Sequence, residues 1–324
     1  MRGRIAQAPW SVIVGSSAER HCPRPRTAGK SRQWPLTRGA ARRDAPAPVP
    51  GRPASRCRYA RCISTYRDEA IVLRRLDYGE ADRILTLLTK EHGKVGAIAK
   101  GVRRPQSRLD PVLQTFGHLD LQLAVGHNLD VVTQAVRLPG PRLPGDLEWT
   151  SRASLIAEVA DRVAEERHPV PDVFELTREG LTEVATATMP RRATARFLMD
   201  ALERFGYAPR LHECASCDRP LPEAPAAFAP EAGGFLCPSC AVPQLPTVSV
   251  AAVKVLRVLA AGDLDLYRRL RLDDELLSAL EDVLEAQLEH HLDRQLRSLR
   301  FLRRARHEGR STASLATPPA AGTE

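Results

Sequence analysis

The chain has 324 residues, 43% of them hydrophobic, which is enough for a folded protein of two domains or of one domain with insertions. Its formal net charge is +9 at pH 7. No stretch comes near the roughly 18 uninterrupted apolar residues of a membrane-spanning helix, so we exclude an integral membrane protein and expect no membrane partner.

The positive charge is concentrated in residues 1–65, which hold 14 Lys and Arg, two acidic residues and eight prolines. This segment carries +12, so the other 259 residues together carry −3. Because it has no apolar period and cannot offset the entropy of ordering, we expect a disordered basic extension. A start codon assigned too far upstream and a targeting sequence fit the same composition, and all three interpretations stay open.

Short β-like runs alternate with turn signals from Tyr66 onward. We expect strands near residues 70–74, 84–89, 95–102, 118–125 and 130–136. The fourth has the clearest period, since Leu119, Leu121 and Leu123 alternate with other residues as in a half-buried strand. Five short strands in so little sequence predict a small closed barrel, of which the OB-fold is the common case.

Helical spacing of apolar residues begins after the breaks at Pro139, Gly140 and Pro141. Thr150 or Ser151 is expected to cap the first helix, and Pro171 to begin the second. Further helices are expected near residues 191–205, 248–260 and 273–304. The predicted fold class is therefore α+β multidomain, with an N-terminal five-stranded OB-fold barrel and an all-helical domain.

Four of the seven cysteines form two CxxC pairs. Nineteen residues separate the pair Cys214 and Cys217 from the pair Cys237 and Cys240, which is the spacing of a four-thiolate zinc site. Four protein ligands leave no open position for water, so we expect one structural Zn²⁺. Paired cysteines in an odd total also favour a metal in a reducing compartment over a disulfide framework, and we expect a cytoplasmic, nucleoid-associated protein.

Other uses of these cysteines stay open. The pairs could be redox dithiols or a disulfide. A zinc deaminase combines the patterns HxE and PCxxC, but His212, Glu213 and Cys214 are consecutive and Pro238 follows Cys237, so neither pattern fits.

The cysteine segment divides the helical domain in two. The predicted boundaries are 66–140 for the OB-fold domain, 145–211 and 244–306 for the two parts of the helical domain, 212–243 for the inserted zinc module, and 307–324 for a disordered tail.

Two clusters of cations could contact nucleic acid. The first lies after the third predicted strand in a loop with Gly and Pro, which could follow a phosphate backbone. The second has six arginines between 294 and 306, more than the preference of cations for a helix C-terminus explains. A solvated surface without a ligand is the alternative for both. The candidate DNA-binding residues are Lys100, Arg103, Arg104, Arg108, Arg297, Arg300 and Arg304.

Motifs of catalytic and nucleotide-binding sites are missing. The sequence contains no GxxxxGK[ST], HExxH, GxSxG or GxGxxG. We therefore expect no catalytic residues, no nucleotide cofactor and no enzyme activity.

Several motifs follow one another in a specific order: residues 66–74 (YRDEAIVLR), 76–85 (LDYGEADRIL), 100–108 (KGVRRPQSR), 113–116 (LQTF) and 205–209 (FGYAP). With this string the chain resembles the RecO family of bacterial DNA repair proteins over about residues 66–305. The resemblance implies an N-terminal OB-fold, a helical domain and an inserted zinc module. It also implies binding of single- and double-stranded DNA, annealing without ATP, and cooperation with RecR and single-strand-binding protein in loading RecA. Family members typically begin just before the first motif, which favours the misassigned start.

The mechanism we expect is a cationic surface that holds one strand by its phosphates and leaves the bases free to pair. The apolar-faced helical domain is expected to make the protein contacts, including one with the acidic C-terminal tail of single-strand-binding protein. Two alternatives remain: a sequence-specific zinc-ribbon DNA-binding regulator, and a zinc-dependent hydrolase or deaminase, which would need an open metal site.

Overall fold

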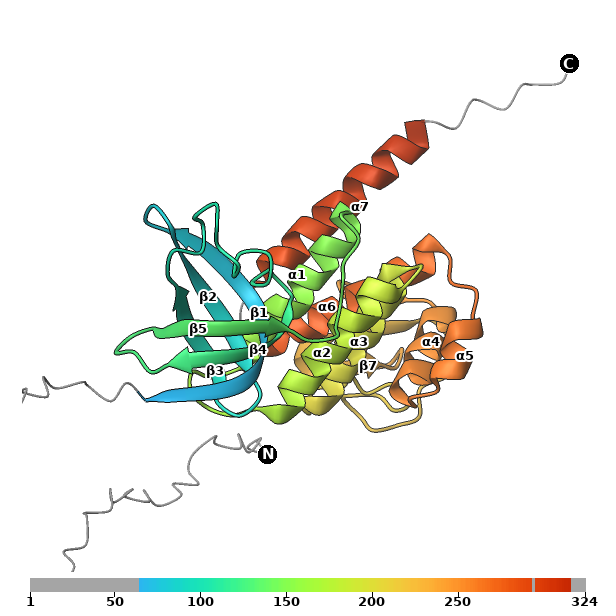
Figure 1. The fold of residues 1–324 in the computed structure, drawn as a ribbon. Coiled ribbons are helices and arrows are strands. Elements are labelled where there is room, and N and C mark those ends of the chain that lie inside the picture. Colours follow the sequence, from blue (N-terminus) through green and yellow to red (C-terminus); the bar gives the residue numbers. More distant parts are fainter. Residues whose placement is uncertain (1–63, 293–294, 316–324) are drawn as a thin grey trace, which may run out of the picture. The chain divides into compact units, whose positions relative to one another are not determined.

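The computed structural model describes residues 64–292 and 295–315, and their side chains as far as Arg306 (Figure 1). The predicted basic extension lies outside the described residues except for its last two, and residues 316–324 lie outside them as well. Within the described ranges, no helix combines the length and apolar character that crossing a membrane requires.

The first five strands form a closed barrel in the order β1-β2-β3-β5-β4. Their bounds are Thr65–Tyr78 for β1, Asp82–Thr89 for β2, Gly93–Ala99 for β3, His118–Ala124 for β4 and Asp130–Arg137 for β5. β1 closes the barrel because its first half pairs with β4 and its second half with β2. The predicted five-stranded OB-fold is thus confirmed.

Strand β1 is 14 residues long, whereas its apolar run predicted only residues 70–74. That run holds the buried apolar residues of the strand, Ala70 to Leu73, and the residues on either side lack an apolar pattern that distinguishes them from a loop. A register shift between Val72 and Arg74 marks a bulge, where the strand leaves β4 and continues beside β2. Beyond the bulge, β1 and β2 form a hairpin that ends at the exposed Tyr78.

Three helices follow the barrel: α1 (Leu147–Val163), α2 (Pro171–Thr186) and α3 (Pro190–Arg204). The side chain of Asp146 caps α1 by accepting from the backbone N–H of Glu148, so the predicted cap at Thr150 or Ser151 was wrong. Leu147, the first residue of the helix, is 67% exposed, and the fully buried apolar residues of α1 begin only at Ala153. Pro171 lies in the first turn of α2, as predicted.

The C-terminal helices are α4 (Val250–Ala260), α5 (Leu264–Arg269), α6 (Asp274–Leu292) and α7 (Arg297–Leu315). Two helices thus replace the single helix predicted over 273–304, and the short α5 was not predicted. The segment between α6 and α7 contains no glycine or proline, so composition gives no sign of the break. The carboxylate of Glu158 in α1 accepts hydrogen bonds from the N–H groups of Arg297 and Ser298, and so caps α7 from another helix.

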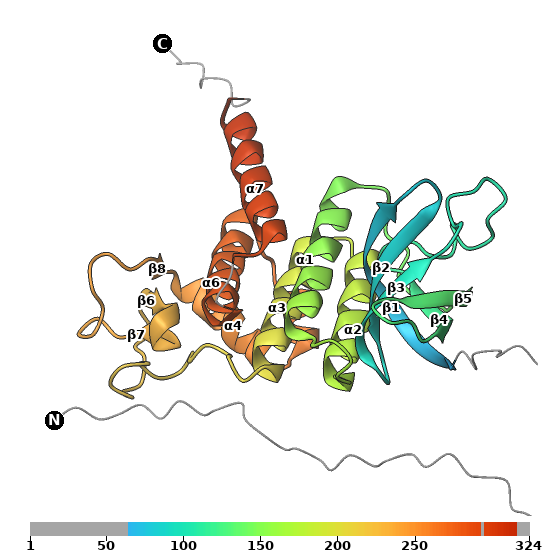
Figure 2. The same cartoon turned by 90° about the vertical axis from the view of Figure 1, so that its left-hand side faces the viewer.

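Helix α7 packs against α1 (Figure 2). Its residues Leu299 and Leu302 are buried in the helical core. It continues to Leu315, so the segment predicted as a tail, 307–324, begins within this helix.

Polar contacts attach one end of the barrel to the helices. Lys94 of β3 pairs with Asp161 of α1 at 3.4 Å, and Arg167 pairs at 2.8 Å with the fully buried Asp130 of β5. At Gly93, with φ +68°, an added Cβ would lie 1.8 Å from the carbonyl oxygen of His168, so only glycine permits this approach.

Candidate metal centre and cationic surfaces

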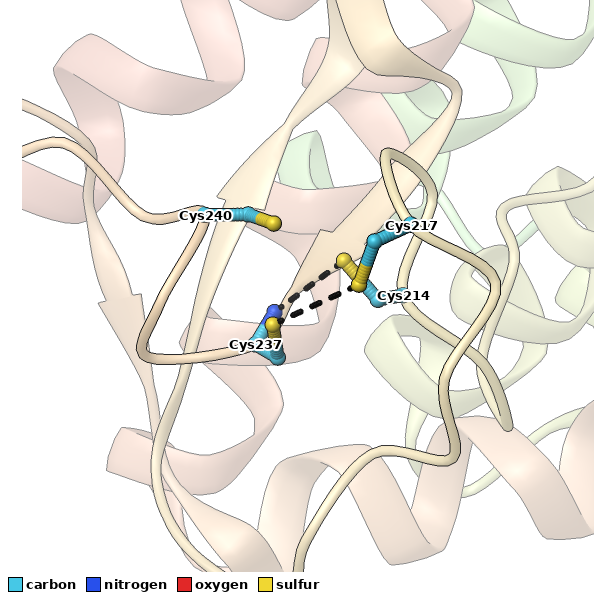
Figure 3. A group of neighbouring side chains, drawn as sticks. All are labelled: Cys214, Cys217, Cys237 and Cys240. Atoms are coloured by element: carbon cyan, nitrogen blue, oxygen red, sulfur yellow. Dashed lines mark hydrogen bonds between the residues drawn. The ribbon is translucent and has the colours of Figure 1, made fainter.

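The four cysteines belong to two tight turns that a small sheet brings together (Figure 3). This sheet has the order β7-β6-β8, with β6 at Ala226–Ala229, β7 at Gly234–Leu236 and β8 at Thr247–Val248. The first turn is closed by a bond from the N–H of Asp218 to the carbonyl of Cys214, and the second by a bond from the N–H of Cys240 to the carbonyl of Cys237. Because Cys237 directly follows β7, the strand sets where the second turn meets the first.

The spacing of the sulfur atoms fits a metal ion better than a disulfide. All four Sγ atoms lie within 4.8 Å of one another, and those of Cys217 and Cys237 are 3.7 Å apart. A tetrahedron with metal–sulfur bonds of about 2.3 Å has edges of about 3.8 Å, whereas a disulfide requires about 2.05 Å. The described cysteines are unbridged, and the tetrathiolate set is the donor set of zinc or of an iron–sulfur centre.

Hydrogen bonds to three of the four sulfurs favour the thiolate form that binds metals. The N–H of Cys237 donates to Sγ of Cys214 at 3.4 Å, and Nε of Arg219 donates to Sγ of Cys217 at 3.4 Å. The hydroxyl of Ser239 lies 3.4 Å from Sγ of Cys237, and this bond is the largest cause that lowers the pKa of Cys237 to about 6. Hydrogen bonds with Cys217 and Cys237 raise the pKa of Cys240 to about 11, so the donors present favour a thiolate at three of the four sulfurs.

An open, catalytic metal site would have used His212 and Glu213, and neither residue belongs to the cysteine cluster. His212 and Glu213 are exposed, and Glu213 pairs instead with Arg210 at 2.8 Å. The candidate metal group consists of the four cysteines and nothing else in the described part of the chain. The cluster packs against an apolar layer that includes Phe228 and Phe235, with ring centroids 5.1 Å apart. This arrangement is typical of a structural metal site.

The first cationic loop is attached to the turn between β1 and β2. Arg103 lies 3.5 Å from Asp77 and donates to the carbonyl of Gly79, while its own N–H donates to the carbonyl of Ala81. The N–H of Gly101 donates to the carboxylate of Asp82 at 2.7 Å. In both views the loop and the turn project from the same end of the barrel (Figures 1 and 2).

The other cations of this loop point to solvent. Lys100, Arg104 and Arg108 are exposed, and their side chains have no ion pair or hydrogen bond within residues 64–292 and 295–306. Three of the four candidates in the loop are thus available to a ligand, and Arg103 is partly engaged in holding the loop.

The second cluster divides into two kinds of arginine. Arg303 and Arg306 pair with buried carboxylates of α6, Glu285 at 2.8 Å and Glu281 at 2.5 Å respectively. The candidates on this helix are exposed and have no ion pair among the described residues: Arg297, Arg300 and Arg304. Arg294 lies outside the described residues.

These arginines do not lie at a helix C-terminus as expected. They occupy the first half of α7, which begins at Arg297, so the helix dipole opposes their charge there and does not explain their number. Sequence reasoning placed them wrongly because it missed the break after α6.

A cleft of about 640 Å³ lies between the barrel, α1 and α7. Arg75 and Phe116 line it from the barrel side, and Arg297 and Phe301 from α7. The exposed side chains of Leu147 and Phe301 give the cleft an apolar part. Arginines of the barrel and of the helices border it. No sequence motif indicates this cleft, because its lining residues come from segments far apart in the chain.

The chain is a multidomain protein with a five-stranded OB-fold barrel, a helical domain and an inserted four-cysteine centre. The OB-fold is a barrel that commonly binds oligonucleotides or oligosaccharides. The family model "Recombination protein O N terminal" matches residues 63–138, and "Recombination protein O C terminal" matches residues 144–300. The chain belongs to the RecO family, which confirms the resemblance seen in the motifs.

Two relatives illustrate the extent of the similarity. The DNA repair protein RecO of Roseiflexus sp. (strain RS-1) is 42% identical over 243 residues, which are 73% of this chain and 84% of the relative. The DNA repair protein RecO of Nocardioides sp. (strain ATCC BAA-499 / JS614) is 41% identical over 244 residues, 74% of this chain and 99% of the relative.

Proposed function

We propose that this protein is a DNA-binding recombination mediator that holds single- and double-stranded DNA by phosphates and anneals complementary strands without ATP. The observation that carries the proposal is the loop with Lys100, Arg104 and Arg108 on a barrel of the OB type: these three cations are exposed, and their side chains make no ion pair or hydrogen bond with the part of the chain that the structure describes. The relatives of the chain are named DNA repair protein RecO. A grip on phosphates leaves the base edges free to meet a second strand, so annealing needs no catalytic residue.

The second cationic surface supports a longer path for the nucleic acid. Arg297 at the start of α7 and Arg75 on β1 border the same cleft, which Thr115 and Phe116 also line, and these two belong to the segment between β3 and β4 that carries the loop cations. We propose that Arg300 and Arg304 extend this path along the exposed side of α7.

The protein partners we propose are RecR and the acidic C-terminal tail of single-strand-binding protein, through which the chain would help to load RecA. The cleft supports the second of these contacts, because exposed Leu147 and Phe301 lie beside Arg162 and Arg297 there. An apolar floor with a cationic border suits an acidic peptide that has an apolar end.

We propose that the metal is one Zn²⁺ held by Cys214, Cys217, Cys237 and Cys240. The four-sulfur donor set supports it, and so does the apolar, closed surrounding of the cluster. When bound, the ion would crosslink the two turns and stabilise a segment whose own sheet has strands of only two to four residues.

The test of the proposed function is an annealing assay on complementary oligonucleotides without ATP. The variant Lys100→Ala/Arg104→Ala/Arg108→Ala should bind every oligonucleotide sequence more weakly by about the same factor, because phosphates carry no sequence information. Each lost contact should also flatten the slope of log affinity against log salt by roughly 0.7 on single strands, or about 2 for three. Annealing should slow in parallel.

A matched control removes three exposed cations elsewhere: Lys254→Ala/Arg268→Ala/Arg271→Ala, on and near α4 and α5. It changes the net charge by the same amount and should leave the salt slope close to that of the wild type. Equal slopes for the wild type and the loop variant would show that the loop is only solvated.

A further inference from the structure

The outer face of the barrel carries an apolar row at the end of the β1–β2 hairpin. Leu76 of β1 is paired with Ile84 of β2, which is paired with Ile98 of β3, so the three side chains share one face. Their neighbours Leu85 and Ala97 are fully buried inside the barrel, which places the row outside. Tyr78 follows Leu76 by two residues and therefore lies on the same outer face.

Helices cover one end of this outer face and leave the other free. Ile71 and Leu88, partners at the covered end, belong to the helical core. At the free end Leu76 is 63% and Tyr78 55% exposed. The ring of Tyr78 has no aromatic neighbour, and its hydroxyl no hydrogen-bond partner, in the described part of the molecule. An exposed tyrosine at the exposed end of a partly buried apolar row contributes nothing evident to the fold.

The backbone that presents Tyr78 is held firmly. Asp77, its neighbour, accepts from Nε of Arg83 at 2.8 Å, and Arg83 is itself only 10% exposed. Asp77 also lies 3.5 Å from Arg103, which ties the turn to the cationic loop. Tyr78 and the loop cations Lys100 and Arg104 are therefore parts of one fixed unit, not of two independently moving loops.

The loop cations and the exposed ring of Tyr78 together indicate which kind of ligand this surface could bind. Cations at the loop suit a polyanionic backbone, and a flat aromatic ring beside an apolar row suits a flat apolar face. A single-stranded nucleic acid offers both, because its bases are unstacked and accessible, whereas a duplex hides the faces of its bases in the stack.

We infer that Tyr78, supported by Leu76, stacks on an unpaired nucleobase of a strand whose phosphates lie on the adjacent cationic loop, and that this contact makes the protein bind single strands more tightly than duplex. The inference rests on the proposed DNA-binding function and deepens it. Phosphate contacts alone do not distinguish the two forms in this way, so the ring is the specificity-determining group.

The test compares Tyr78→Ala and Tyr78→Phe in the full-length protein. Fluorescence anisotropy at fixed salt measures binding of a thymidine oligonucleotide, an abasic strand of the same length and a duplex. Loss of one stacked base corresponds to roughly 5- to 150-fold in affinity, so Tyr78→Ala should lose about tenfold on the thymidine strand and little on the duplex. Tyr78→Phe keeps the ring and should bind like the wild type. Val136→Ala, another exposed apolar residue on the barrel, is the matched control.

The outcomes separate this inference from the proposed function. A wild type that binds neither strand nor duplex would overturn both. A wild type that binds, with an equal loss on strand and duplex for Tyr78→Ala, would overturn the stacking contact alone, as would an unchanged affinity. The wild type itself should bind the thymidine strand about tenfold more tightly than the abasic strand, which tests the contact even if the alanine variant folds poorly. The salt slope of Tyr78→Ala should equal that of the wild type, because the ring contacts no phosphate.

Discussion

Replacement of Cys214 by Ser is expected to lower the free energy of unfolding by several kcal/mol and to abolish tight binding of zinc. A structural zinc ion supplies roughly 10 to 16 kcal/mol at neutral pH, and one lost thiolate out of four forfeits a sizeable share of it. Cys214 is fully buried, so a hydroxyl in its place would also leave a polar group in an apolar layer. Chemical denaturation measures the loss of stability, and metal analysis of the purified protein measures the zinc.

The matched control is Ser216→Ala, an exposed position between the two cysteines of the first turn. It leaves all four sulfurs in place and should retain one zinc per chain with almost unchanged stability. Purified wild-type protein without zinc, and with a melting temperature that a chelator does not change, would contradict the proposed metal.

The variant Cys214→Ser should keep its affinity for DNA if it remains folded. The barrel core consists of residues of the five strands and of the segment between β3 and β4, and it contains no residue of the cysteine module. The cationic loop is held by Asp77, Asp82 and the β1–β2 turn. Like the barrel core, these residues lie far from the cysteines in the sequence. A large loss of affinity in soluble, folded Cys214→Ser would therefore indicate that the module itself contacts the nucleic acid.

Features whose cause is local were predictable from the sequence. The CxxC spacing gave the cluster because two short turns place two sulfurs each, whatever the rest of the fold does. Alternation in β4 gave a strand because Leu119, Leu121 and Leu123 all face the barrel core. The start of α2 was predictable because proline at its first turn acts through its own backbone.

Features whose cause lies elsewhere in the chain were missed. The break between α6 and α7 has its cap on Glu158, far away in α1. The role of Arg103 depends on Asp77 in another strand, and the exposed position of Tyr78 depends on a bulge that redirects β1. The one available signal for a buried ion cluster was the presence of Glu281 and Glu285 on the apolar face of α6, at helical spacing from Leu277, Leu284 and Leu288.

That ion cluster joins three helices to α6. The carboxylate of Glu281 is 1% exposed and pairs with Arg152 of α1 at 2.8 Å, with Arg191 of α3 at 2.8 Å and with Arg306 of α7 at 2.5 Å. Burial raises the pKa of Glu281, but the bond from Arg191 and the charges of all three arginines outweigh it, so the pKa lies below its ordinary value. The stability from this depressed pKa is therefore present above the ordinary value of 4.5 and is lost as the pH falls through the folded-state pKa.

Glu281→Gln is expected to destabilise the protein by about 3 to 5 kcal/mol at pH 7, the cost of leaving buried charges without their partner. The change keeps the shape of the side chain and removes only its charge, and Arg152, with a side chain 4% exposed, is then left with the half-exposed Glu148 alone. Equilibrium urea denaturation with the wild-type slope would measure the difference.

The control is Glu148→Gln, which removes the other carboxylate of the same arginine. Glu148 is 44% exposed and lies 3.3 Å from Arg152, so its loss should cost at most about 1 kcal/mol. If both variants lose the same small amount, Glu281 does not hold the helices together. If the wild-type protein loses stability as the pH falls below 4.5 while Glu281→Gln changes much less over the same range, the acid sensitivity of the helical domain originates at this carboxylate.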